Sequence, residues 1–85
     1  MITTIRRHVQ KRCPFKDEMD SGELVIVFDG TAPELHQLAK EVDSLASNPI
    51  SHENFTGQLA AILPPGTSVT TTWNTGPWSV EVRET

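Results

Sequence analysis

Prolines divide the middle of the chain into two short helical stretches, and this division limits the folds open to it. Thr31 is a good N-cap, Pro33 suits a first turn and Glu34 completes a capping box, so a helix is expected to begin here. Asn48-Pro49 ends that helix, and Ser51 is the N-cap of a second helix, which Pro64-Pro65-Gly66 ends. Apolar residues mark one face of each helix: Leu35, Leu38, Val42 and Leu45 in the first, and Phe55, Leu59, Ile62 and Leu63 in the second.

Strand-forming stretches flank this helical pair on both sides. Residues 2–12 have the pattern of a weak strand, and GELVIVF at 22–28 is almost wholly β-forming. Residues 67–73 and 78–84 are expected to be strands, joined by a turn at 74–77. The order β-β-α-α-β-β predicts an α+β domain, in which a four-stranded antiparallel sheet carries both helices on one face. Such a sheet has two open edges, and a ring of subunits that pairs these edges would protect them.

The length and composition indicate a small domain that gains stability from partners. The 85 residues make one domain, 1–85. Their hydrophobic content of 36% lies below the range of about 45–50% that is typical of globular domains, which favours oligomerisation. The net charge of −4 argues against a broad nucleic-acid footprint, unless the basic stretch RRHVQKR at 6–12 forms a rim in the oligomer.

The single cysteine and the lack of a long apolar run indicate the cellular compartment of the protein. A single cysteine excludes an internal disulfide and a cysteine-based zinc site, and no His-x-x-x-His pattern occurs, so no metal is predicted. No apolar run reaches the roughly 18 residues of a membrane helix, and the N-terminus lacks the apolar centre of a signal peptide. We therefore expect a cytoplasmic protein that does not contact a membrane.

The one thiol stands in a charged segment, CPFKDEMDSG, that is expected to be a loop. A partly exposed thiolate is a nucleophile, and the neighbouring Lys11, Arg12 and Lys16 would stabilise its negative charge. Asp20, seven residues after Cys13, could supply a proton in a later step. The alternative interpretation is an ordinary surface thiol next to an ordinary loop acid.

Further candidates lie at the helix starts and around the last turn. The helix dipole explains Glu53 but gives no reason for His52, and the pair would form a hydrogen-bonding edge for a purine-like base. Glu34 is explained by its capping role. For Trp73 and Trp78, packing in the core or across strands is favoured over stacking on a planar ligand.

Taken together, these residues resemble the motifs of the QueF-type nitrile reductases of the tunnelling-fold superfamily. Cys13-Pro14 with Asp20, Glu34 at the head of the first helix, and His52-Glu53 eighteen and nineteen residues later match that family over roughly residues 10–83. The family reduces 7-cyano-7-deazaguanine with NADPH through a covalent thioimide. The resemblance implies that Cys13 attacks the nitrile carbon and Asp20 protonates the nitrile nitrogen. It also implies that Glu53, His52 and Glu34 bind the substrate.

The sequence departs from the family at its cofactor signature. There a glutamate is followed by a lysine two positions on and another three further, whereas this chain has His36 and Ala39, with Lys40 displaced by one. The family's glycine-rich, arginine-bearing turn is replaced by Asn74-Thr75-Gly76-Pro77. We therefore assign no cofactor, since the NADPH signature is present in degraded form only. The chain looks closer to a shorter branch that adds ammonia to the thioimide, as in archaeosine synthesis on tRNA.

Three hypotheses remain open at this point. The leading one is an enzyme whose Cys13 thioimide is resolved by ammonia or by NADPH hydride. The second is a tunnelling-fold module that binds a purine-like or pterin-like ligand without turnover, and the third is a domain whose site is a relic. The resemblance also implies a homo-oligomeric ring with pockets between subunits. The sequence leaves open whether the substrate is a free base or a base within nucleic acid.

Overall fold

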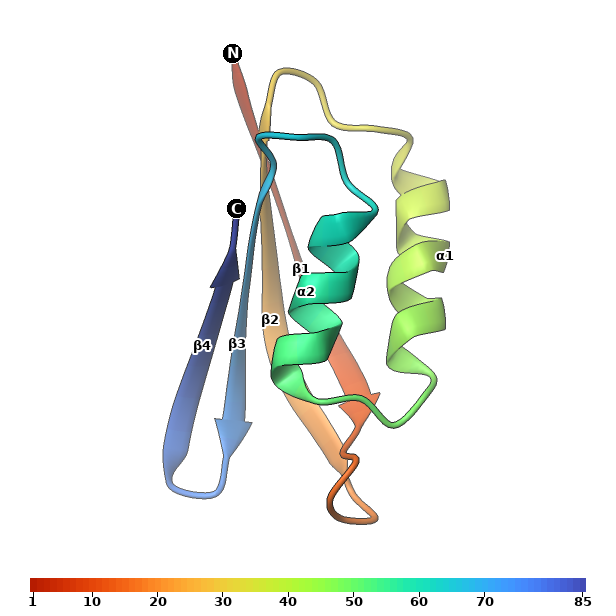
Figure 1. Cartoon of the computed structure of the whole chain (residues 1–85), viewed down its shortest axis with the longest axis vertical. Coiled ribbons are helices and arrows are strands. Elements are labelled where there is room, and N and C mark those ends of the chain that lie inside the picture. Colours follow the sequence, from red (N-terminus) through yellow and green to blue (C-terminus); the bar gives the residue numbers. More distant parts are fainter.

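The computed structural model describes all residues, 1–85, as one antiparallel sheet with two helices on one face (Figure 1). The strands are neighbours in the order β1-β2-β3-β4. The elements are β1 (Ile2–Arg12), β2 (Met19–Asp29), α1 (Leu35–Ala46), α2 (His52–Ala61), β3 (Ser68–Thr75) and β4 (Trp78–Glu84). The predicted fold class and element order are confirmed. Neither helix is long and apolar enough to cross a membrane.

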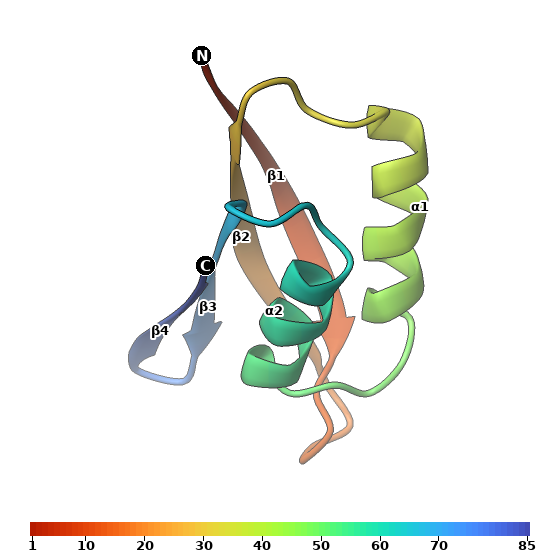
Figure 2. The same ribbon diagram turned by 45° about the horizontal axis from the view of Figure 1, so that its top comes forward.

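The helical layer covers one face of the sheet unevenly. α1 packs against β1, and α2 packs against β3 and β4 (Figure 2). Apolar residues from both helices, the segment between them and three strands make up the core: Val9, Leu24, Ile26, Phe28, Leu38, Val42, Ile50, Phe55, Leu59, Val69 and Trp73. The predicted apolar helix faces are partly confirmed, because Leu35 and Ile62 at the helix ends are half exposed.

The two helix starts differ in how well they were predicted. The Ser51 hydroxyl accepts a hydrogen bond from the Asn54 backbone N–H at 3.1 Å, which confirms Ser51 as the N-cap of α2. The N-cap of α1 is Glu34 and not Thr31, and the Glu34 carboxylate accepts a hydrogen bond from the Gln37 N–H. Pro33 restricts Ala32, the residue before it, to extended backbone, so the helix cannot begin directly after Thr31.

The predicted loop around Cys13 is shorter than expected. The β1–β2 ladder continues to the pairs Lys11–Asp20 and Arg12–Met19, and the Cys13 N–H donates to the Glu18 carbonyl at 2.9 Å. Hairpin pairing thus extends β2 three residues beyond the β-forming run. As a result, Asp20 lies in a strand, where the sheet fixes its position.

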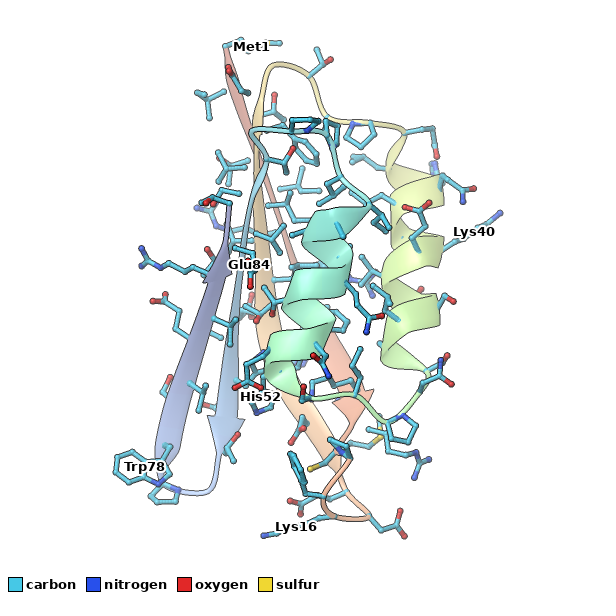
Figure 3. All side chains as sticks on the ribbon, in the orientation of Figure 1. Met1, Lys16, Lys40, His52, Trp78 and Glu84 are labelled. Carbon is cyan, nitrogen blue, oxygen red and sulfur yellow. The ribbon has the colours of Figure 1, made fainter.

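The two tryptophans have opposite environments. Trp73 is completely buried, which confirms its packing role. Trp78 is 72% exposed, so the prediction that it packs is wrong for the single chain. Trp78 begins the edge strand β4 at the tip of the last hairpin, where α2 does not reach it (Figure 3).

Candidate functional site

One end of the sheet carries a cavity of about 650 Å³, which is within the usual size range of small-molecule sites. The β1–β2 loop, the start of α2 and the β3–β4 turn form its walls. Figure 3 shows Lys16 of that loop and His52 of α2 at this same end of the molecule. Four of the five predicted site residues line the cavity: Cys13, Asp20, His52 and Glu53.

The fifth predicted residue, Glu34, lies elsewhere. It stands at the start of α1, at the opposite end of the molecule from the β1–β2 loop (Figure 1). Its carboxylate bonds the Gln37 N–H and lies 2.8 Å from His36 Nδ1. The hydrogen bond from Gln37, followed by that from His36, lowers the pKa of Glu34 below its usual value. Within one chain, Glu34 therefore has a capping role and does not reach the cavity.

The sequence placed Lys11 next to Cys13 as a stabilising cation, but its burial in the cavity floor and its pairing with Asp20 were not predicted. Its side chain is fully buried, and its ammonium donates to Asp20 Oδ2 at 2.9 Å and to the Ile50 carbonyl at 2.7 Å. The same ammonium lies 4.8 Å from the centroid of the Trp73 ring. Lys11 thus neutralises the buried Asp20 carboxylate, which would otherwise be too costly to keep charged inside the protein.

Trp73 lies beneath the cavity and packs against His52, Phe55 and the Lys11 ammonium. Its indole N–H donates to Thr71 Oγ1 at 2.8 Å, and Phe55 packs edge-on against its ring at 5.5 Å. Gly22 lies opposite Trp73 on β2, where the ring fills the space that a side chain would need. The close approach of Trp73 to the β2 backbone therefore depends on glycine.

We expect Gly22→Ala to lower the free energy of unfolding by about 1–3 kcal/mol, near the upper end, because the core has no room for the added carbon. An added Cβ would lie 2.5 Å from the Thr72 carbonyl oxygen and 2.7 Å from the Trp73 ring. Gly57→Ala is the matched control. Its Cβ would meet nothing nearer than 3.9 Å, so it should stabilise α2 by about 0.5–1 kcal/mol. Urea unfolding of both variants tests this, and equal effects would contradict it.

His52 lies flat on Trp73, with ring centroids 4.9 Å apart and planes 9° from parallel. Its Nε2 is 3.0 Å from Thr75 Oγ1, and its Nδ1 is buried without a partner. Burial, together with the positive charge of Lys11, lowers the pKa of His52 below 6.5, although Asp20 and Glu53 oppose this shift. The imidazole is therefore neutral at pH 7, and a proton on Nε2 can be donated to Thr75.

This shift predicts a loss of stability on mild acidification. Because the folded state disfavours the protonated ring, the stabilisation from His52 is complete above pH 6.5 and is lost as the pH falls below it. The free energy of unfolding should fall more steeply between pH 7 and pH 5 in the parent than in His52→Gln. Identical slopes in parent and His52→Gln would contradict the shift.

The remaining cavity residues supply the reactive groups. Cys13 is partly buried at the end of β1, and Glu53 is exposed in the first turn of α2. Of the cations expected to stabilise a Cys13 thiolate, Lys11 is bonded to Asp20 and Arg12 to Asp17 at 3.1 Å. The cavity thus combines a thiol, a carboxylate in an ion pair and an accessible carboxylate, which suits addition to a polar electrophile.

The start of α1 lacks the two lysines of the family's cofactor signature. His36 is bonded to Glu34, and Ala39 lines a cleft between α1 and the sheet that Arg6 and Arg7 of β1 also line. No cation stands where the signature requires one. The chain also has no group of three or more His, Cys, Asp or Glu side chains placed to hold a metal ion.

Comparison with known proteins gives a match to solved structures. No family model matches the sequence, and no curated protein matches it. The chain is similar to the crystal structure of the archaeosine synthase QueF-like in the apo form, with 26% sequence identity and a TM-score of 0.84. The match covers 98% of this chain and 90% of that chain, so it includes all the elements that form the cavity.

Proposed function

Because the chain belongs to the QueF-like tunnelling-fold family, we propose that it is an enzyme acting on the nitrile of a 7-cyano-7-deazaguanine-type base. The observation that supports this most directly is the shared cavity of Cys13, Asp20, His52 and Glu53. In this proposal the Cys13 thiolate bonds to the nitrile carbon and forms a thioimide. The Glu53 carboxylate accepts hydrogen bonds from the N–H edge of the base, and His52 forms the adjoining wall.

A nitrile is a weak electrophile, so addition of sulfur needs a proton for the nitrogen in the same step. Asp20 lines the cavity on the strand next to Cys13, and it is the group proposed to deliver that proton. Ammonia then adds to the thioimide carbon, and the thiolate leaves to give an amidine. We favour this resolution because the two lysines of the NADPH signature are replaced by His36 and Ala39, and no step through that cofactor is proposed.

The test is an intact-mass spectrum of the protein incubated with 7-cyano-7-deazaguanine. The proposal expects a mass increase equal to the whole ligand. Added ammonium should then remove the adduct and release an amidine, whereas NADPH should leave it in place. If NADPH instead releases the aminomethyl base, hydride is the resolving agent. If a folded protein gives no adduct, the covalent mechanism is wrong.

The second candidate is a module that binds a purine-like or pterin-like ligand without turnover. The missing cations near Glu34 favour it, because they leave the thioimide without the family's reductant. It predicts ligand affinity that survives Cys13→Ser and is lost in Glu53→Ala, with no product from the parent. Calorimetry of the three proteins beside a product assay separates the two candidates.

We also expect a homo-oligomer that brings Glu34 of one chain to the substrate of another. β1 and β4 are open edges, and the exposed Trp78 lies on the second of them. Pairing of β4 with β1 of a neighbour would close both edges into a ring. Light scattering after gel filtration should give a mass of several chains, and a stable monomer at micromolar concentration would contradict this expectation.

A further inference from the structure

The ion pair on the cavity floor raises a chemical difficulty for Asp20 as the acid. A carboxyl that is bonded to an ammonium at 2.9 Å is held as carboxylate, and a carboxylate has no proton to give. The proton that the nitrile nitrogen takes up must therefore have another origin.

The bonding of Lys11 identifies that origin. Two of its three N–H groups are donated to Asp20 Oδ2 and the Ile50 carbonyl, and the ammonium also lies against the Trp73 ring. With a side chain 1% exposed, Lys11 has no free N–H for a ligand. Asp20 Oδ1, by contrast, has no partner in the chain and is not among the fully buried unpaired atoms, so it is accessible from the cavity.

We propose that the Lys11 ammonium supplies the proton for thioimide formation and that Asp20 relays it. This inference rests on the proposed function. Asp20 Oδ2 first takes the Lys11 proton, which leaves a neutral amine and a protonated carboxyl group. Rotation of this carboxyl group about its Cβ–Cγ bond turns the O–H toward the cavity. As the Cys13 sulfur then bonds to the nitrile carbon, one C–N π pair moves to nitrogen and takes that proton, and Asp20 becomes a carboxylate again. The proton that the thiol released earlier returns to Lys11, so the net change is addition of S–H across the nitrile.

The burial of this ion pair beside the cavity supports a role in chemistry. A buried ion pair is often no more stabilising than apolar residues of the same volume. The pair lies in the wall of the cavity, two residues from Cys13 along β1, and it is held against Trp73. Lys11 acts through Asp20, so it is a positioning and proton-supplying residue and does not contact the substrate.

The first test compares rates of adduct formation in the parent and in Lys11→Met from pH 6 to pH 9. Without the ammonium, Asp20 must itself be protonated to act as the acid. The ratio of parent to variant rates, in which the thiolate fraction cancels, should then rise about tenfold for each pH unit above the pH at which Asp20 ionises in the variant. A structural role alone would lower the rate by a constant factor, and a constant ratio would overturn the inference.

The second test is Lys11→Arg, which decides the question if Lys11→Met does not fold. Arginine keeps the positive charge beside Asp20 but does not give up its proton. Adduct formation should fall by roughly 100-fold or more, the contribution of a general acid. A parental rate in Lys11→Arg would overturn the inference.

The control is Lys40→Met, which changes an exposed lysine on α1 and should keep the parental rate and pH profile. If the parent forms no adduct, the proposed function is wrong, whereas an adduct with unaltered variant kinetics contradicts this inference alone.

Discussion

Cys13→Ala should abolish the covalent adduct and all turnover while leaving the fold and the reversible binding of the base close to parental. The thiolate is the proposed nucleophile, and no second cysteine can replace it. The side chain is only partly buried and is not part of the core, so its loss should change the free energy of unfolding by about 0.5 kcal/mol or less. Intact mass, a product assay and calorimetry measure the three quantities.

Cys13→Ser is the matched control for this prediction. Its hydroxyl keeps the polarity and nearly the size of the thiol but is a much weaker nucleophile, so it should also give no adduct. An adduct that persists in either variant would place the nucleophile elsewhere. Loss of reversible binding in Cys13→Ala, with the fold intact, would mean that the thiol holds the base as well as attacking it.

The sequence predicted local structure best where only one residue could take a given role. Ser51 could be recognised as a cap because the serine hydroxyl satisfies a backbone N–H that has no partner within the helix. At the other helix start two caps competed, and the proline between Thr31 and Glu34 decided in favour of the later one. The four predicted residues that line the cavity were identified by their match to the motifs of the QueF-type family, before the fold explained why that spacing brings them together.

The burial of Lys11 and its pairing with Asp20 were missed because they depend on strand register. In RRHVQKR it resembles a solvated basic residue, and its partner Asp20 is nine positions away. A signal was nevertheless present: Lys11 shares the side of β1 with Ile5 and Val9, which face the helices. Extending the predicted hairpin toward its turn would have placed Asp20 directly opposite Lys11. The exposure of Trp78 could not be foreseen, because it depends on how far α2 extends over β4.

The stability of the domain should depend strongly on the same ion pair. Lys11→Met should lower the free energy of unfolding by about 3–5 kcal/mol at pH 7, because it leaves the Asp20 carboxylate buried and unpaired. Lys40→Met, which changes an exposed lysine, should have an effect within about 0.5 kcal/mol. Denaturant unfolding of both variants beside the parent measures the difference.

A double substitution distinguishes the effect of the unpaired charge on stability from the effect of the lost Lys11 packing contacts. In Lys11→Met/Asp20→Asn no charge is left unpaired, and the new amide faces the cavity, where it can bond to water, so most of the lost stability should return. Acid should have the same effect on Lys11→Met alone, since protonation of Asp20 removes the buried charge. If neither the second substitution nor acid restores stability, Lys11 contributes through its volume and its contact with Trp73 and not through its charge. Lys11→Met should regain stability in the pH range in which Asp20 is protonated. Adduct formation by the same variant depends on the same protonation, so the unfolding and adduct-formation experiments must give the same pH range.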